Sequence, residues 1–273
     1  MKVAFQGEHG AYSEEAILQH FKSNVVPVPR PTLKEVFDSV EDGEVDLGLV
    51  PVENTLEGSI VRTYDLLLES PLKVQAEVIL RVVHCLIANP GVTKNEVKRV
   101  YSHPQALGQC RNYLEQQSYE AVATYDTAGS VKMLKEKGLM DAAAIASGWA
   151  AEVYDMTVLA RGIETHSENY TRFFILGPED HPATGRDKTS IAFSVEHAPG
   201  TLFQALMAFA EQKVNLTKIE SRPRVGRPWE YIFYLDFEGH KNEARISKAL
   251  DSLRTCSQFI KIFGSYPRSA LKV

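Results

Sequence analysis

The chain has 273 residues, of which 44% are hydrophobic and 24% are charged, with a formal net charge of -5. This length allows more than one compact unit, because a single hydrophobic core usually stops growing at about 250–300 residues. The dispersed basic residues disfavour a nucleic acid as partner, and no apolar run approaches the ~20 residues that span a bilayer, so no membrane partner is expected.

The three cysteines are odd in number, widely separated and not arranged as Cys-x-x-Cys. Neither a disulfide framework nor a zinc site is therefore expected, and all three are interpreted as buried or half-buried thiols in a reducing compartment. The apolar run at residues 1–7 is too short for the core of a signal peptide. A cytoplasmic protein is the expectation.

The first elements alternate between strand and helix. Residues 2–6 are predicted as a strand, followed by a turn at residues 7–10 and a helix with Ser13 as its N-cap. Thr32 and Glu35 form a capping box ahead of a second helix. Residues 45–50 are predicted as the next strand, ended by Pro51.

The alternation continues through the middle of the chain. Strands are predicted at residues 82–88 and 97–101, then a helix opened by His103 and Pro104, and then a helix capped by Thr127. Further short strands are predicted at residues 142–146, 157–160 and 172–176. This pattern favours a mainly parallel sheet in each of two α/β lobes, with the second lobe at about residues 82–165.

A second domain is predicted after a linker. Residues 177–187 are rich in Gly, Pro and charge, which is typical of a linker. The elements beyond the linker are predicted in the order strand, helix, strand, strand, helix, strand, which is a ferredoxin-like βαββαβ unit. The predicted domains are residues 1–180 and residues 188–273.

Five motifs occur in the order and spacing of one enzyme family. They are GEHGAYSEEA from Gly7, PVENTLEGSI from Pro51, SHPQ from Ser102, DTAGS from Asp126 and NYTRF from Asn169. With them the chain resembles the prephenate dehydratases over nearly its whole length. The resemblance implies a two-lobed, periplasmic-binding-protein-like α/β catalytic domain followed by a ferredoxin-like ACT regulatory domain.

The implied reaction removes a carboxylate as CO2 and a hydroxyl as water from the cyclohexadienyl ring of prephenate, which gives phenylpyruvate for phenylalanine biosynthesis. Formation of the aromatic ring drives it, so no metal or other cofactor is needed. The enzyme must hold a dianion and supply a proton or strong hydrogen bond to the leaving hydroxyl, a contribution of about 10²–10⁴.

The NYTRF motif supplies the expected donor. The resemblance implies that Thr171 sits at the leaving hydroxyl as a positioned donor or relay, and that Arg172 pairs with a substrate carboxylate through its fork of donors. Phe173 is assigned to substrate binding. The alternative, on the tripeptide alone, is a strand end with an exposed polar pair.

The other candidate residues follow strands or begin helices. Glu53 and Asn54 are candidate catalytic groups, and Glu53 alternatively ties the loop to backbone amides. Gln105 is a candidate catalytic group, and Ser13, Thr127 and Ala128 are candidate substrate contacts, because helix N-termini offer N–H groups to carboxylates. Gln105 and Thr127 alternatively only cap helices. His103 is interpreted as a cap or packing group in preference to a general base.

The C-terminal domain carries two segments that resemble the phenylalanine-binding motifs of ACT domains. The implied L-phenylalanine contacts are Pro199, Gly200, Thr201 and Leu202, and Glu220, Ser221, Arg222 and Pro223. Such sites lie between two subunits, so a homodimer or homotetramer is expected, with feedback inhibition by phenylalanine. The alternative is a tight turn at Gly200 and a solvated edge charge at Arg222.

The first motif departs from the family pattern, since Glu8 stands in place of Pro and Ala11 in place of Thr. The Gly-Ala-Tyr-Ser form also occurs in relatives that dehydrate arogenate, so arogenate is an alternative substrate. A non-catalytic sensor of a small anion or an amino acid is the other alternative, because two α/β lobes around a cleft also suit ligand capture.

Overall fold

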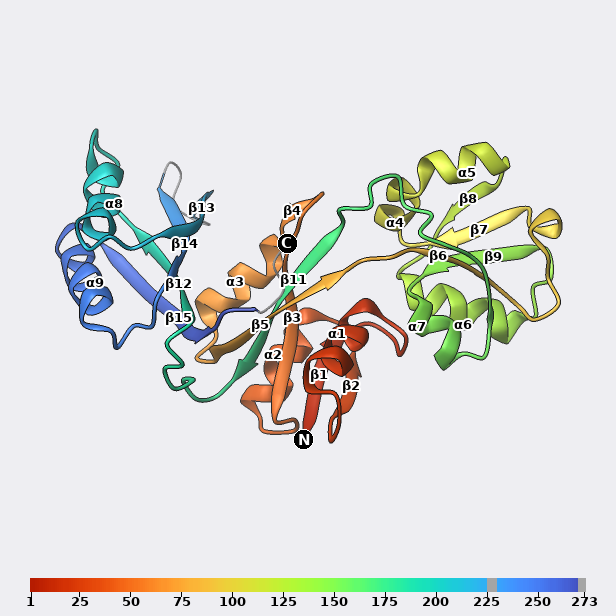
Figure 1. The fold of residues 1–273 in the computed structure, drawn as a ribbon, viewed down its shortest axis with the longest axis horizontal. Helices are drawn as coiled ribbons and strands as arrows, with labels where there is room; N and C mark the ends of the chain where they lie inside the picture. Colours follow the sequence, from red (N-terminus) through yellow and green to blue (C-terminus); the bar gives the residue numbers. More distant parts are fainter. Residues whose placement is uncertain (225–229, 270–273) are drawn as a thin grey trace. The chain divides into compact units, whose positions relative to one another are not determined.

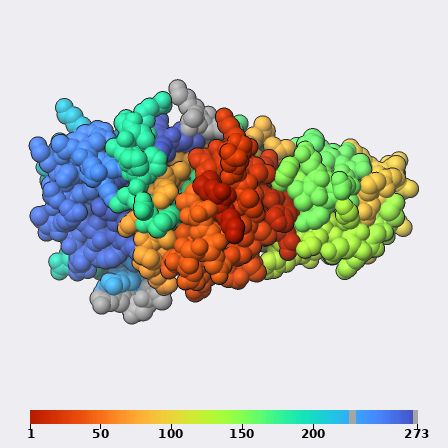
Figure 2. Space-filling model, turned by 90° about the horizontal axis from the view of Figure 1, so that it is seen from below, coloured from red at the N-terminus to blue at the C-terminus, as the bar shows by residue number. Residues whose placement is uncertain are grey.

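The computed structural model describes residues 1–224 and 230–269 (Figure 1). Internal contacts divide the chain into two compact units, one of residues 1–63 and 78–173 and the other of residues 64–77 and 174–273. In the space-filling view the N-terminal residues, in red and orange, form one continuous surface (Figure 2). No helix in the described ranges is both long and apolar enough to cross a bilayer.

The first lobe is built on a six-stranded sheet with the order β2-β1-β3-β11-β5 and with β4 paired to β3. Strand β1 runs parallel to both β2 and β3. The elements are β1 (Lys2–Gln6), α1 (Tyr12–Phe21), β2 (Val26–Arg30), α2 (Leu33–Glu41), β3 (Leu47–Asn54), β4 (Gly58–Ser59), α3 (Val61–Glu69), β5 (Lys73–Arg81) and β11 (Tyr170–Gly177).

Helix α2 begins as the sequence predicts. Thr32 is its N-cap, and the Thr32 side chain accepts a hydrogen bond from the Glu35 N–H at 3.2 Å, while the Thr32 hydroxyl donates to the Glu35 carboxylate at 2.9 Å. Val36, Phe37 and Val40 are buried on the face that packs against β1 and β3. Thr32 is therefore confirmed as the N-cap, while the reciprocal bond of a full capping box, from the Thr32 N–H to the Glu35 carboxylate, is not among the hydrogen bonds of the described residues.

Strand β3 does not end at Pro51, as the sequence suggested, but continues to Asn54. Its pairing with β1 stops at Leu49, so Pro51 has no ladder hydrogen bond to that strand to lose. The continuation carries Glu53 and Asn54, which pair with β4. This two-strand extension places Asn54 at the cavity described below.

The second lobe has a five-stranded sheet with the order β10-β6-β9-β7-β8. Helices α4 and α5 lie on one side of it and α6 and α7 on the other (Figure 1). The elements are β6 (Cys85–Ala88), the 3-10 turn η1 (Lys94–Glu96), β7 (Arg99–Ser102), α4 (Pro104–Gln109), α5 (Arg111–Gln117), β8 (Glu120–Ala123), α6 (Thr127–Lys137), β9 (Ala142–Ala146), α7 (Gly148–Val153) and β10 (Thr157–Arg161).

Neighbouring side chains along the strands of this sheet point to opposite faces, so the apolar residues form two separate cores, one on each face. Leu86 of β6 and Ile145 of β9 belong to the cluster that contains Leu107 of α4. Their strand neighbours Ile87 and Ala144 belong to the cluster that covers α6 and α7. Both faces are buried, which explains why β9 consists entirely of small or apolar residues.

The expected mainly parallel arrangement is wrong for this second sheet. Strand β7 runs parallel to β8 and β9, but β6 runs antiparallel to both β9 and β10. Hydrophobic runs indicate burial on two faces and carry no information about strand direction, so the sequence pattern could not distinguish the two cases.

The C-terminal elements form a βαββαβ unit, as predicted. They are β12 (Asp187–Ser194), α8 (Thr201–Glu211), β13 (Leu216–Pro223), β14 (Tyr231–Glu238), α9 (Ala244–Cys256) and β15 (Phe259–Pro267). The sheet order is β13-β14-β12-β15, and all three pairings are antiparallel. Helices α8 and α9 contribute to one core with Ile191, Leu235 and Phe237 of the sheet. The ferredoxin-like fold is confirmed.

Candidate active site

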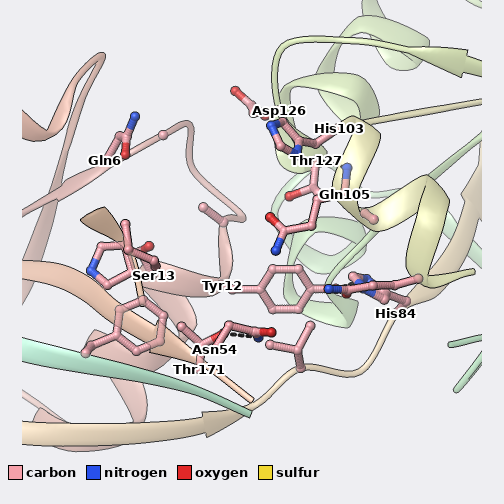
Figure 3. Close-up of a pocket in the computed structure, with 18 of the residues that line it drawn as sticks. Gln6, Tyr12, Ser13, Asn54, His84, His103, Gln105, Asp126, Thr127 and Thr171 are labelled. Carbon is pink, nitrogen blue, oxygen red and sulfur yellow. Dashed lines mark hydrogen bonds between the residues drawn. The ribbon is translucent and has the colours of Figure 1, made fainter. Parts of the chain in front are cut away.

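A cavity of about 480 Å³ lies in the first unit and is lined by residues of both lobes (Figure 3). The residues that line it are Gln6, Gly7, Ala11, Tyr12, Ser13, Pro51, Asn54, Ile60, Val82, His84, His103, Gln105, Ala106, Gln109, Tyr125, Asp126, Thr127, Thr171 and Phe173. The structure therefore brings together six predicted site residues, namely Ser13, Asn54, Gln105, Thr127, Thr171 and Phe173.

The N-terminus of α1 faces this cavity. Ala11 is the N-cap of α1, and no side chain of the described residues makes a capping hydrogen bond there. Ser13 is therefore not the cap that the sequence suggested but the second residue of the helix, and it lines the cavity. An uncapped helix start carries about half a positive charge and unpaired N–H groups, which suits a carboxylate.

The helix starts of the second lobe are capped by side chains. Asp126, and not Thr127, is the N-cap of α6, and its carboxylate accepts the Gly129 N–H. Burial raises the pKa of Asp126, and the hydrogen bond from Gly129 opposes that rise. His103 is the N-cap of α4, because its Nδ1 accepts the Gln105 N–H at 3.3 Å. The interpretation of His103 as a cap is confirmed, although it also lines the cavity.

Asn54 is buried and saturated with hydrogen bonds. Its Oδ1 accepts the backbone N–H groups of Leu56 at 2.9 Å and Glu57 at 3.1 Å. Its Nδ2 donates to Asn169 Oδ1 at 2.8 Å and to the Thr171 hydroxyl oxygen at 3.0 Å, and the Tyr170 carbonyl is a more distant acceptor at 3.2 Å. Since backbone N–H groups only donate, they fix which end of the amide is oxygen, so Thr171 accepts from Asn54.

Glu53 and Arg172 are not among the residues that line the cavity. Successive side chains of a strand point to opposite faces, so Thr171 and Phe173 on β11 face the cavity while Arg172 does not. On β3 both Pro51 and Asn54 line the cavity, so alternation alone does not explain why Glu53 is outside the lining. Arg172 Nη1 instead lies 3.7 Å from Glu53 Oε2. The contact of Arg172 with a substrate carboxylate and the catalytic role of Glu53 therefore stay predictions.

Ala128 is also outside the cavity lining. As the second residue of α6 its side chain points into the lobe and is fully buried in the cluster with Val131 and Leu134. It packs the helix that presents Thr127.

Besides His103, six polar residues that line the cavity were not among the predicted site residues, namely Gln6, Tyr12, His84, Gln109, Tyr125 and Asp126. Tyr12, His84 and Gln109 line it, and the Gln109 side chain accepts from the Asn169 Nδ2 at 2.8 Å. Gln109 lies four residues after Gln105 on one helix, a spacing that places both on one face and could have indicated it. His84 falls within residues 82–88, which were predicted as one strand, but it lies between β5 and β6, which begins at Cys85.

The cavity is polar without a fixed positive charge. None of the described residues that line it is Lys or Arg. No group of three or more His, Cys, Asp or Glu in the described part of the chain is placed to hold a metal ion. An anionic ligand in this cavity would therefore be held by neutral donors and by the helix start of α1.

A second cavity of about 240 Å³ lies in the C-terminal domain. Gly200, Thr201 and Leu202 of the predicted phenylalanine site line it, together with Tyr231 and Phe233 of β14. Pro199 and the segment from Glu220 to Pro223 do not. That segment lies on β13, beside β14, where Glu220 is 3.3 Å from Lys218 and Arg222 is 3.4 Å from Asp65.

Two α/β lobes that share a polar cavity, joined to a ferredoxin-like domain with a cavity of its own, define a small-molecule enzyme with a regulatory domain. Comparison with known families agrees: the prephenate dehydratase model matches residues 3–181 and the ACT domain model matches residues 189–255. The chain belongs to the prephenate dehydratase family. It is accordingly a carbon–oxygen lyase, an enzyme that dehydrates and decarboxylates its substrate.

Relatives from bacteria and plants span the whole chain. A bifunctional chorismate mutase/prephenate dehydratase of Aquifex aeolicus is 40% identical over 100% of this chain and 75% of its own length. An arogenate dehydratase/prephenate dehydratase of Arabidopsis thaliana is 44% identical over 98% of this chain and 73% of its own length.

Solved structures are similar over the same extent. A prephenate dehydratase from Arthrobacter aurescens in complex with L-Phe has a TM-score of 0.90 and 31% identity, covering 98% of this chain and 90% of that one. A protein described as a novel type of quorum quenching acylase has a TM-score of 0.92 and 34% identity, covering 99% of both chains.

Proposed function

We propose that the cavity of the first unit is the active site for the conversion of prephenate to phenylpyruvate, with Thr171 as the donor to the leaving hydroxyl. The observation that carries this proposal is the orientation of the Asn54 amide. Because Thr171 accepts a hydrogen bond from Asn54, its own O–H proton needs another acceptor. Thr171 lines the cavity, so that acceptor is the hydroxyl of a bound substrate.

The threonine assists in a step that the substrate itself drives. As the carboxylate leaves as CO2, the electron pair of the broken C–C bond enters the ring and the C–O bond to the hydroxyl breaks. The hydroxyl leaves as water and needs a hydrogen bond that strengthens as charge develops on its oxygen. A Thr hydroxyl is a weak acid, so Thr171 acts as a fixed donor or relay for a proton that water supplies.

The start of α1 is proposed as a site for one substrate carboxylate. The N–H groups of its first turn have no side-chain cap among the described residues, and Ser13 adds a hydroxyl. The start of α6 is less suitable for an anion, because the Asp126 carboxylate already occupies it. Gln105 and Thr127 are proposed as further neutral donors, and Phe173 as an apolar contact for the ring.

Arogenate is a second candidate substrate. Arogenate carries an ammonium group that prephenate lacks, and the cavity offers the Asp126 carboxylate but no Lys or Arg among its described lining residues. A carboxylate at the cavity favours a substrate with a cationic group and disfavours a dianion. The resemblance to plant enzymes named for arogenate supports testing both substrates.

Regulation by phenylalanine is proposed through the C-terminal domain. The relative from Arthrobacter aurescens was solved in complex with L-Phe, and here Gly200, Thr201 and Leu202 line a small cavity. The φ angle of Gly200 is +85°, a conformation that favours glycine, and Gly200 is the N-cap of α8. The alternative, that Gly200 serves only to form a tight turn, does not account for the cavity that it lines.

Helix α3 is proposed as the element that carries the effector signal. It begins at Val61, directly after the β3–β4 extension that holds Asn54. In the second unit, Arg222 of β13 pairs with Asp65 of α3, and Lys261 of β15 donates to the carbonyls of Leu68 and Ser70 at its end, both at 2.7 Å. A change at β13 or β15 would thus be transmitted along α3 to the Asn54 loop.

Three broader expectations complete the proposal: a catalytic domain at residues 1–180 with a regulatory domain at residues 188–273, a homodimer or homotetramer, and a cytoplasmic location. The substrate assignment is tested by incubating the purified protein with prephenate and with arogenate, each with and without L-phenylalanine, and by following the aromatic product. Turnover of prephenate that phenylalanine suppresses is expected. Failure to convert either substrate would overturn the proposal and would make hydrolysis of acyl substrates the next activity to assay.

A further inference from the structure

A continuous chain of hydrogen bonds connects Thr171 on β11 to Tyr12, the first residue of α1. Asn54 connects Thr171 to Asn169, and the Asn169 Nδ2 donates to Gln109 Oε1 at 2.8 Å. Gln109 Oε1 lies 2.8 Å from His84 Nε2, and His84 Nδ1 lies 2.8 Å from the Tyr12 hydroxyl. In Figure 3 the Tyr12 ring crosses the cavity with its hydroxyl directed at His84, between Gln105 on one side and Asn54 on the other.

The direction of every hydrogen bond in this chain follows from its first member. The N–H groups of Leu56 and Glu57 fix the Asn54 amide, so Asn169 must present Oδ1 to Asn54 and Nδ2 to Gln109. Gln109 then presents Oε1 to both Asn169 and His84, and its Nε2 donates to the Glu57 carboxylate at 3.3 Å. Two backbone amides thus set the orientation of three side-chain amides.

The same logic fixes the tautomer of His84. Because Gln109 Oε1 only accepts, His84 Nε2 carries the proton, and in the neutral imidazole Nδ1 is an acceptor. The Tyr12 hydroxyl faces Nδ1 at 2.8 Å and is the donor there, while the Val83 carbonyl, at 3.2 Å, is a more distant acceptor for the same proton.

We infer that Tyr12 and His84 are positioning residues for the reaction: they hold the Gln109 side chain in place at the far end of the hydrogen-bond chain, so that Asn169 and Asn54 keep the positions that leave the Thr171 proton free for the substrate. This inference rests on the proposed function of Thr171. It adds that Tyr12 has two duties, since its ring lines the cavity while its hydroxyl fixes the imidazole. Neither residue donates a proton to the substrate.

The surroundings of His84 favour the neutral form that this role requires. The ring is buried, and burial lowers the pKa of His84, against the opposing effects of Gln109 and Glu164. Burial also raises the pKa of Tyr12 well above its ordinary value, so that its hydroxyl keeps its proton. The other titratable groups around the pair are Glu164, which accepts the backbone N–H of His84 at 2.9 Å, and Glu15, Cys85 and Cys110, which act on Tyr12.

Three variants test the inference by steady-state kinetics on prephenate. Tyr12→Phe removes only the hydroxyl, and we expect kcat to fall about tenfold, the effect of one lost buried hydrogen bond, with KM nearly unchanged. His84→Gln keeps a donor toward Gln109 and should retain most of kcat, whereas His84→Met removes the donor and should lower kcat about tenfold or more. Tyr119→Phe is the matched control, because Tyr119 donates to the Lys94 carbonyl in the second lobe and does not line the cavity.

A ¹⁵N NMR spectrum of the imidazoles measures the tautomer without reference to activity. The signals of His84 are identified by their loss in His84→Gln, and we expect a neutral ring protonated at Nε2 in the wild type. A ring protonated at Nδ1, or unchanged kcat in both Tyr12→Phe and His84→Met, would overturn the inference while leaving Thr171 as donor. Wild-type protein that fails to convert prephenate or arogenate would instead overturn the proposed function, whatever the tautomer of His84.

Discussion

At the scale of single residues, the site depends on which side chains share a strand face or a helix start. The motif residues Asn54, Gln105 and Thr171 come together in one cavity, and strand alternation on β11 separates Arg172 from them. Both outcomes follow from the strand bounds, which sequence patterns locate only to within a few residues. The polar contacts of His84 with Tyr12 and Gln109 join residues far apart in the chain and were not predictable.

Gly10 is required by the backbone. Its φ angle is +90°, and a Cβ there would lie 2.8 Å from the Cα of Ala150. Its N–H donates to the buried Glu14 carboxylate, and its carbonyl accepts from Ser147. We expect Gly10→Ala to lower the free energy of unfolding by about 2–4 kcal/mol, through strain and a clash that cannot relax.

The matched control is Gly43→Ala, where φ is also positive at +72° but no atom lies within 4 Å of the new Cβ. Its expected cost is about 1 kcal/mol, from backbone strain alone. Urea unfolding of the two variants measures the difference, and equal midpoints would mean that the contact with Ala150 does not constrain the turn.

Asp126 is the residue that we expect to set the substrate preference. Asp126→Asn removes the charge but keeps a good N-cap for α6. Without the carboxylate, kcat/KM for prephenate should rise or stay constant, and kcat/KM for arogenate should fall about tenfold, the size of one partly exposed charge pair. The ratio of the two kcat/KM values is the measurement, and an unchanged ratio would remove Asp126 from substrate recognition.

At the scale of the elements, sequence patterns predicted most strands and helices but missed four in the first lobe, namely β2, β4, α3 and β5. Strand β2 reads Val-Pro-Val-Pro-Arg, and its two prolines argue against a strand, yet β2 is at the edge of the sheet, where proline is tolerated. Helix α3 and strand β5 were also not predicted. The order of the C-terminal elements was correct, because alternation of clear apolar runs defines each of them.

The proposed role of helix α3 in regulation is tested by a substitution at Asp65. Asp65→Asn removes the charge that Arg222 contacts, and it should leave basal turnover unchanged while weakening inhibition by phenylalanine about five- to tenfold, a coupling of about 1 kcal/mol. Asp38→Asn is the control, since Asp38 pairs with Lys34 on the exposed face of α2. The concentration of phenylalanine that halves activity is compared among the three proteins. The same value for wild type and Asp65→Asn would exclude this ion pair from the signal.

At the scale of the whole molecule, the two-lobed α/β fold and the ACT domain were both predicted, whereas strand direction in the second sheet was not. Hydrophobic spacing reports burial, and connection lengths only partly constrain direction. The family motifs supplied the rest, because they fix residues at strand ends and helix starts that must meet for the chemistry to occur.

The stability of the fold should depend on pH through His84. Burial lowers the pKa of His84 below its ordinary value of 6.5, so the unfolded chain binds the proton more readily than the folded chain. The free energy of unfolding therefore decreases as the pH falls below about 6.5. His20, whose pKa burial also lowers, contributes in the same direction.

In His84→Gln, which cannot titrate, the free energy of unfolding should change less between about pH 6.5 and 5.5 than in the wild type. Denaturant unfolding at the two pH values measures this change. An equal change in both proteins would show that His84 titrates alike in the folded and unfolded states.

The donor role of Thr171 is tested most directly by the kcat of Thr171→Val and Thr171→Ser on prephenate. Valine keeps the shape of threonine without the hydroxyl, and serine keeps the hydroxyl. We predict that kcat falls by about 10²–10⁴ in Thr171→Val with little change in substrate binding, and that Thr171→Ser retains much of the wild-type rate. Wild-type kcat in Thr171→Val would contradict the account.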